Sequence, residues 1–415
     1  MKTVLFLPVG LGLAHSGRLI MIANELRKKR VNVVFGAGSD AIPLLKREDF
    51  QFETIPEFSR EIIKNKVNKN NPFFFTRKII ETFVEAELEL YKKVKPDLIV
   101  FDLRPSARIS AEIAGIKKVS ICNANFTPYY DFTKIRFPAS TFLVKFLSSR
   151  MFVLINRKYG QKFLNKVGPK ILQAILMIET IRMTPSLIRI GYKLKKDPYQ
   201  FFLGDITLMT DIPEFRPIKS LPDNVKMIGP VFWNGGSKLP IWKGELDRKD
   251  PIVYVSASGT GDKKLFVKIL EFLKDSKYTI VATTGNTLKP SEVKLRYSKL
   301  YLTDYLPGEF IMKRAKVIIF PGGNASCYQA LSYGVPQILT PLHIDQEDNS
   351  NQLERLGTGI IINPYNGFNR NNLLEALNKI SADNSYKENA LKLKKVMGGY
   401  NGPETAAKII KRFIH

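Results

Sequence analysis

The feature that most limits the fold is a strand, a glycine turn and a helix that recur in both halves of the chain. In the first half, an apolar run at 4–9 is followed by Gly10 and Gly12, and then by a helical pattern over 16–29. A second apolar run at 31–35 completes the series, which is how a parallel, doubly wound sheet begins. The expected strands of this half are 4–9, 31–35, 98–101 and 119–122.

The second half repeats this order of strand, turn and helix. The expected strands are 252–255, 279–282, 317–320 and 337–340. At 415 residues the chain is long enough to form two cores. The sequence therefore predicts an α/β protein with two Rossmann-like, doubly wound domains that face each other across a cleft.

Proline and glycine mark the boundary between the two halves. Six prolines occur between positions 213 and 251, together with Gly235 and Gly236, and no long periodic pattern interrupts them. The expected organisation is an N-terminal domain over 1–232, a linker over 233–250, a C-terminal domain over 251–398 and a last helix over 399–415.

A net charge of +26 predicts a partner or surface of negative sign. The charge is concentrated in an insert at about 133–196, which holds fourteen basic residues and one acidic residue, Glu179. Apolar residues recur three and four positions apart between the basic ones, as in amphipathic helices that lie on an anionic membrane. The alternatives are an ordinary core stripe with a solvated face, and a generally lysine-rich composition.

Cysteine and histidine usage excludes two classes of site. Two cysteines and three histidines give neither a disulfide framework nor a histidine-based zinc site. No secretory signal is recognisable, and no uninterrupted apolar stretch approaches the ~18 residues that span a bilayer. We expect a cytoplasmic protein, with a peripheral position on the inner face of the membrane if the insert binds lipid. The charge alone does not indicate nucleic-acid binding, because no known module accompanies it.

The strongest chemical motif is a glycine turn that follows a strand and opens a helix. Gly322 and Gly323 allow a phosphate to approach the backbone, and the following helix start offers free N–H groups and a hydroxyl from Ser326. Asp345 and Gln346 follow the next strand, where their side chains could bond sugar hydroxyls. The plainer alternatives are a tight turn and a helix cap.

Residues 301–359 resemble the donor-binding signature of the UDP-glycosyltransferase family, which includes macrolide and lipid glycosyltransferases of bacteria. The family pattern of His-Gly-Gly-x-Gly-Ser, Glu-Ala-Leu, Gly-Val-Pro, Pro and Asp-Gln corresponds here to 321–326, 329–331, 334–336, Pro341 and 345–346. The resemblance implies the GT-B fold and an inverting, metal-independent transfer. It also implies that the last helix crosses back to the first domain.

The resemblance assigns roles to individual residues of the second half. The residues implied to bind the donor diphosphate are Gly322, Gly323, Asn324, Ala325, Ser326, Ser258, Gly259 and Thr260. Those implied to contact the ribose and base are Gln329, Tyr305 and Leu306, and those implied to bind the donor sugar are Asp345 and Gln346. Two positions depart from the family: Pro321 replaces a histidine that contacts phosphate, and Gln329 replaces a glutamate that binds ribose.

The first half supplies a candidate general base. His15 follows the turn that contains Gly10 and Gly12, and Asp102 ends the expected strand 98–101 at the same edge of the sheet. A carboxylate bonded to the imidazole would orient it for proton abstraction from a hydroxyl. The family's glycine-rich turn with histidine, and its aspartate after a Pro-Asp-Leu-Val-Val pattern, resemble these positions, although Ala14 stands where the family has glycine. The alternative is a helix cap and a turn residue.

These motifs together predict a hexosyltransferase that moves a sugar from a nucleotide-diphosphate donor, UDP-linked by resemblance, to a hydroxyl of a hydrophobic, lipid-like acceptor. The nucleotide sugar is then a co-substrate, and neither a cofactor nor a metal is expected. Two alternatives are a nucleotide-sugar epimerase of the same fold, and a non-catalytic protein that binds nucleotide sugars. A small soluble acceptor is the alternative to a lipid, because the resemblance is weakest over 125–215.

Overall fold

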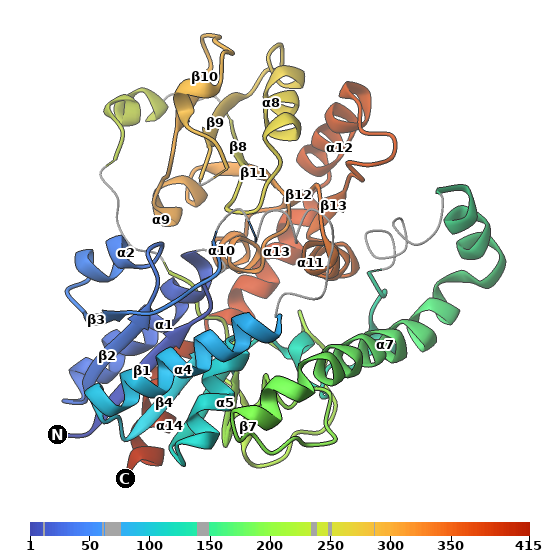
Figure 1. Ribbon diagram of the computed structural model, residues 1–415. Coiled ribbons are helices and arrows are strands. Elements are labelled where there is room, and N and C mark those ends of the chain that lie inside the picture. The colour runs from blue at the N-terminus through green and yellow to red at the C-terminus, as the bar shows by residue number, and fades with distance from the viewer. Residues whose placement is uncertain are drawn as a thin grey trace. The chain divides into compact units, whose positions relative to one another are not determined.

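The computed structural model describes residues 1–10, 13–59, 62, 76–138, 149–233, 239–247, 251–285 and 287–415. The predicted turn residue Gly12 lies outside these ranges. The chain forms two compact units, each built on its own sheet (Figure 1). Unit 1 comprises Met1–Lys134, Lys162–Trp233 and Tyr400–His415, and unit 2 comprises Ile135–Gln161 and Asn234–Gly399.

Unit 1 contains a seven-stranded sheet whose pairings are all parallel, in the order β3-β2-β1-β4-β5-β6-β7. Its strands are β1 (Thr3–Pro8), β2 (Asn32–Ala37), β3 (Gln51–Thr54), β4 (Leu98–Asp102), β5 (Lys117–Cys122), β6 (Ile206–Met209) and β7 (Val225–Met227). The strand order reverses between β1 and β4, so the carboxyl ends of these two strands form the switch point at which open α/β sheets bind ligands.

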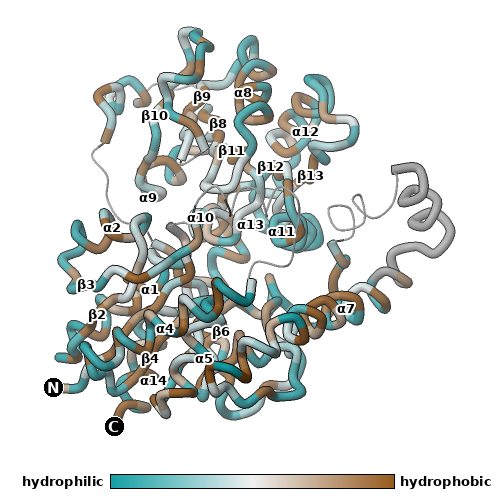
Figure 2. Tube along the Cα trace, viewed as in Figure 1, coloured by the Kyte–Doolittle hydropathy of each residue, from teal (hydrophilic) through white to brown (hydrophobic). Residues whose placement is uncertain are grey.

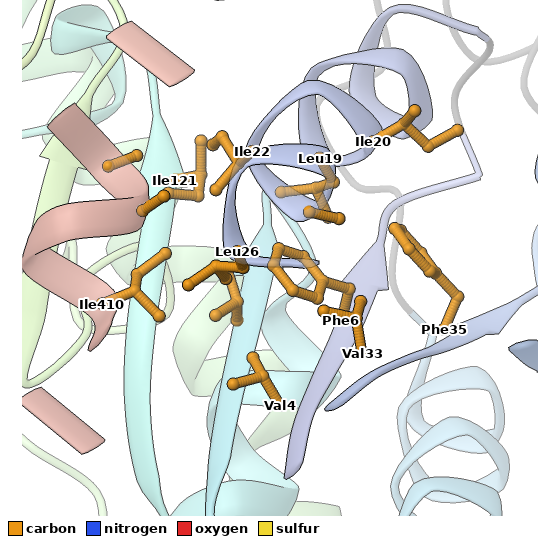
Figure 3. Close-up of a cluster of buried hydrophobic side chains, with 14 of the residues drawn as sticks. Val4, Phe6, Leu19, Ile20, Ile22, Leu26, Val33, Phe35, Ile121 and Ile410 are labelled. Atoms are coloured by element: carbon orange, nitrogen blue, oxygen red, sulfur yellow. The ribbon is translucent and has the colours of Figure 1, made fainter. Parts of the chain in front are cut away.

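The helices of unit 1 are α1 (Leu13–Lys28), α2 (Ile42–Arg47), α4 (Arg77–Val94), α5 (Pro105–Ile113), part of α7 (Ser149–Arg189) and α14 (Gly402–Ile414), with short 3-10 turns at Ala124–Phe126 and Phe132–Lys134. Thr76 caps α4 by accepting from the Ile79 N–H. Apolar side chains of α1, β1, β5 and α14 share one core, in which Leu26 and Ile410 lie near Val4 (Figure 3). The last helix of the chain is therefore part of the first sheet's core.

Unit 2 contains a six-stranded parallel sheet in the order β10-β9-β8-β11-β12-β13. Its strands are β8 (Ile252–Ser256), β9 (Thr279–Thr283), β10 (Leu300–Thr303), β11 (Ala315–Phe320), β12 (Gln337–Leu339) and β13 (Gly359–Ile361). Its helices are α8 (Lys263–Phe272), α9 (Gly308–Met312), α10 (Asn324–Ser332), α11 (Ile344–Arg355), α12 (Arg370–Ala382) and α13 (Asn384–Met397), with 3-10 turns at Ile241–Asp247 and Pro290–Glu292. Here the order reverses between β8 and β11.

The structure differs from one expectation about the organisation of the chain. The insert at 133–196 was expected to belong wholly to the N-terminal domain, whereas 135–161 groups with unit 2. The reason is a set of contacts to α11, in which Asn351 donates to the Arg136 carbonyl at 3.2 Å and Arg136 pairs with Glu354 at 3.6 Å.

Candidate active site

His15 and Asp102 meet at the switch point of the unit 1 sheet. His15 lies in the first turn of α1, and Asp102 is the fully buried last residue of β4. The imidazole Nδ1 lies 3.0 Å from Asp102 Oδ1, which confirms that the carboxylate reaches the ring. Because Nδ1 is engaged, Nε2 is the nitrogen that can accept a proton from a substrate. The His15 side chain is only partly buried, so a hydroxyl can approach it.

Arg18 shares Asp102 with His15, a contact that the sequence analysis missed. Arg18 Nε lies 3.0 Å from Asp102 Oδ2, and its NH1 donates to Asn123 and Thr210 at the ends of β5 and β6. The guanidinium compensates the charge of the buried carboxylate and ties three strand ends together. The sequence did hold a signal for this contact. Arg18 lies three positions after His15 on a helix that packs against the sheet, and a buried arginine needs an acidic or polar partner.

A second buried arginine, Arg104, fixes the backbone beside Asp102. It follows Leu103, whose φ of 45° is unusual for a residue other than glycine. Arg104 Nε donates to Glu87 at 2.6 Å, and NH1 and NH2 donate to the carbonyls of Pro8 and Pro56 at 3.2 and 3.0 Å. The end of β1 and the segment after β3 are thus held to the turn after β4.

Gly10, predicted as part of the glycine turn, makes room for a buried carboxylate. A Cβ on Gly10 would lie 2.4 Å from Glu57 Oε2, and one on Gly38 would lie 2.3 Å from the same atom. Burial raises the pKa of Glu57, and the nearby Arg104 partly offsets this. Because Gly10 and Gly38 have no side chains, they leave space for the Glu57 carboxylate at the same edge of the sheet as His15.

The glycine turn of unit 2 has the geometry of an anion site. Gly322 has φ +97°, a conformation that glycine adopts without strain, and its carbonyl accepts from Asn349 Nδ2 at 2.9 Å. Gly323 then caps α10, which begins at Asn324. A Cβ built on Gly323 would have no atom within 4 Å. Open space therefore lies beside the first N–H groups of α10, where a phosphate would bind.

The predicted second wall of this site, Ser258 to Thr260, lies beside the donor-sugar residues. Ser258 has φ +60°, which is uncommon for serine and typical of strained functional loops. The Thr260 hydroxyl accepts from Gln346 Nε2 at 3.0 Å, while Gln346 Oε1 accepts from the Leu342 N–H at 2.8 Å. Both ends of the buried Gln346 amide are thus bonded within the protein, and it joins the two loops.

His343 is a further residue of this edge that sequence reasoning missed. It is the residue before α11, two positions ahead of Asp345. Within the described ranges its Nε2 is buried and has no hydrogen-bond partner. Burial lowers the pKa of this imidazole, and Asp345 partly offsets the effect. The ring is thus held in its neutral form beside the predicted sugar residues.

Gln329 lies on α10, and Tyr305 and Leu306 follow β10. A Cβ on Gly308 would lie 1.9 Å from Gln329 Nε2, so this amide packs against the start of α9. The Leu306 side chain is buried, whereas Tyr305 is partly exposed. Among the described residues, no group of three or more histidine, cysteine, aspartate or glutamate side chains is placed to hold a metal ion.

Replacing Gly322 with alanine should lower the free energy of unfolding by about 1–3 kcal/mol, because an L-residue is strained at this φ. The new Cβ would also lie 2.8 Å from Ser350 Oγ. Gly323→Ala is the matched control: with φ −63° and open space around its Cβ, it should shift stability by no more than about 1 kcal/mol. Urea unfolding measures both, and equal losses would contradict the assignment of strain to Gly322.

Comparison with known proteins places this geometry in a family. A rhamnosyltransferase of PGL/p-HBAD biosynthesis from Mycobacterium bovis is 30% identical over 366 residues, which cover 87% of this chain and 77% of the relative. The chain belongs to the macrolide-type UDP-glycosyltransferase family. A PGL/p-HBAD biosynthesis glycosyltransferase from Mycobacterium tuberculosis is 29% identical over 96% of this chain and 89% of its own length. This member of the family is thus a glycosyltransferase, an enzyme that transfers a sugar.

Two further comparisons agree with the fold of this glycosyltransferase. The C-terminal domain model of the erythromycin biosynthesis protein CIII-like family matches residues 269–413. The solved structure of spinosyn forosaminyltransferase SpnP is similar with a TM-score of 0.69 and 18% identity, covering 100% of this chain and 99% of that one. Together with the two parallel sheets, these matches establish the predicted GT-B fold.

Proposed function

We propose that this glycosyltransferase moves a sugar from a nucleotide-diphosphate donor, with UDP as the expected nucleotide, to a hydroxyl of a hydrophobic acceptor. We propose that the transfer inverts the configuration at the anomeric carbon. The observation that carries the proposal is the bond between His15 Nδ1 and Asp102, because it leaves Nε2 available as a base. In one displacement, His15 removes the hydroxyl proton as the oxygen attacks the anomeric carbon. Asp102 then stabilises the imidazolium.

The leaving diphosphate is assigned to the start of α10. Its first N–H groups and the positive end of the helix dipole offset the charge that develops on the departing oxygen. Residues 322–326 and 258–260 would surround the diphosphate, and Tyr305, Leu306 and Gln329 the nucleoside. Asp345 would bond the sugar directly, and Gln346 would do so only by exchanging its bond to Thr260. We infer that no metal is needed.

The acceptor and donor-sugar proposals rest on the charge of the insert and on the activity for which a relative is named. The insert is strongly basic and rich in apolar residues, which suits a lipid-like acceptor at an anionic membrane surface. The M. bovis relative is named a rhamnosyltransferase, so rhamnose belongs among the first donor sugars to be tried. We propose a cytoplasmic enzyme that works peripherally at the inner face of the membrane.

The test is acceptor-dependent release of nucleotide. The full chain is incubated with UDP- and dTDP-linked sugars, rhamnose included, with either a lipid extract or water-soluble aglycones, and with or without EDTA. We expect one donor to be consumed only with the lipid extract, equally with EDTA, to give a product of inverted anomeric configuration by NMR. Gly323→Ala should lose donor binding while remaining folded, because its methyl group enters the proposed phosphate site.

Two other outcomes would support the alternatives. Conversion of the donor to its epimer without acceptor would indicate an epimerase of the same fold. Donor binding without turnover on any acceptor would indicate a binding protein, a reading that Pro321 and Gln329 favour because both replace residues through which the family contacts the nucleotide. Retention of configuration in the product would contradict the single displacement.

A further inference from the structure

The outward side of helix α7 carries large apolar side chains that are exposed. Within its described side chains, the exposed ones are Phe163, Ile171, Ile178, Ile181 and Ile188, which we call the α7 apolar face. Ile181 and Ile188 are 63% and 65% exposed. At about 100° per residue, the five positions fall within roughly 100° of one another around the helix. Figure 2 colours much of this part of α7 as hydrophobic.

The opposite side of α7 is packed against unit 1. Met183 and Leu187 are buried in a cluster with Ile80 and Val84 of α4 and Ile109 of α5. Arg77 also donates to the Arg182 carbonyl, and Arg189 pairs with Glu81. The C-terminal part of α7 is therefore fixed to the body of unit 1 by one side, and the α7 apolar face is its solvent side.

Basic residues flank the α7 apolar face. Lys166, Lys170, Arg182 and Arg189 are exposed on the same helix, and Glu179 is the only acidic residue between positions 163 and 189. Lysine and arginine with long stems beside exposed isoleucines are the pattern of helices that lie at the boundary between lipid headgroups and acyl chains. Each such charge also attracts an anionic leaflet.

The helix is better suited to lie in a membrane surface than to cross it. Over Asn165–Arg189 it is long and apolar enough to span a bilayer by length and composition, and it is the one such helix within the described ranges. However, its buried side is part of the unit 1 core. Pro169 and Pro185 also remove backbone donors within the helix. A single exposed face is what an interfacial helix requires.

We propose that the α7 apolar face inserts into the headgroup region of an anionic lipid bilayer, with the flanking lysines and arginines at the phosphates. The inference rests on the proposed function in one respect, since it says how an enzyme with a lipid acceptor meets that acceptor. It identifies the membrane-binding element as Phe163 to Arg189 of unit 1.

Vesicle co-sedimentation tests the proposal without requiring any sugar transfer. The full chain is mixed with vesicles of phosphatidylcholine alone, or with added phosphatidylglycerol. We expect binding to the anionic vesicles that weakens with salt. The double variant Ile181→Asp/Ile188→Asp should bind at least about tenfold more weakly, because it loses two exposed apolar side chains that would enter the bilayer and gains two negative charges. Ile241→Asp/Leu391→Asp, at exposed apolar positions of unit 2, should bind like the wild type.

The result is made independent of folding and of catalysis by two further measurements. Both positions are exposed, so the double variant should unfold at the wild-type urea midpoint. The double variant should also consume donor at the wild-type rate when the acceptor is dispersed in detergent, because no membrane binding is then needed. This measurement distinguishes a failure of the proposed sugar transfer from a failure of the proposed membrane binding. The proposal would be overturned if the wild-type protein did not bind anionic vesicles, or if the double variant bound them as strongly as the wild type. A wild-type dimer that the double variant abolishes would also overturn it, because such a dimer would assign this face to a second copy.

Discussion

Replacing His15 with alanine should lower the rate of acceptor-dependent nucleotide release by roughly 10²–10⁴, the usual loss on removing a general base. His15 Nδ1 lies 3.0 Å from Asp102 Oδ1, so Nε2 is the nitrogen that takes the proton in the proposed mechanism, and alanine at this position removes it. The measurement is single-turnover release with saturating donor, because it isolates the chemical step from product release.

Controls separate a catalytic loss from a structural one. Donor affinity should be unchanged in His15→Ala, since the proposed donor residues belong to unit 2. His415→Ala, at the exposed C-terminal residue, should release nucleotide at the wild-type rate. If His15→Ala releases nucleotide as fast as the wild type, His15 is structural and the proposed mechanism is wrong.

Replacing Glu87 with alanine should cost about 3–5 kcal/mol of unfolding free energy, because it leaves the buried charge of Arg104 without its main partner. Glu87 is fully buried and accepts from Arg104 Nε at 2.6 Å and from the hydroxyls of Ser106 and Ser110 at 2.7 and 2.8 Å. Glu57 Oε1 lies farther away, 3.6 Å from Arg104 NH1, so it would compensate the positive charge of Arg104 only in part. Urea unfolding followed by circular dichroism measures the loss.

The same helix supplies the matched control. Glu89 also lies on α4, but it is exposed and pairs with Lys92 in solvent, so Glu89→Ala should change stability by less than about 1 kcal/mol. The double variant Glu87→Leu/Arg104→Met should recover much of the loss, because it removes both buried charges. A Glu87→Ala protein as stable as the Glu89→Ala protein would show that Arg104 is compensated without Glu87.

Predictability from the sequence followed the strength of local patterns. Eight strands were predicted because their apolar runs are continuous, as buried parallel strands require, and observed β4 and β11 end within a residue of the expected limits. Strands β3, β6, β7, β10 and β13 were missed, since strands of three or four residues carry little periodicity. The glycine turn and the His15–Asp102 contact could be placed because both sit directly after strands.

The rest depended on contacts between residues far apart in the chain. Arg18 and Arg104 are ordinary basic residues in the sequence, and only the fold brings Asp102 and Glu87 to them. In the same way, the bond from Gln346 to Thr260 spans 86 positions, so no local pattern could show that this amide is already engaged. The roles proposed for the site residues in substrate binding and catalysis remain predictions.

The path of the chain between the two units has a consequence for engineering new specificities. The C-terminal helix α14 contributes Ile410 and Ile414 to the core of unit 1, although it follows unit 2 in sequence. A chimera that joins the first half of this protein to the entire second half of a relative would therefore carry a foreign helix into the core of unit 1. Residues 400–415 should be exchanged together with residues 1–134 and 162–233, and hybrids with this second crossover after Gly399 should fold more often than hybrids fused only at the linker.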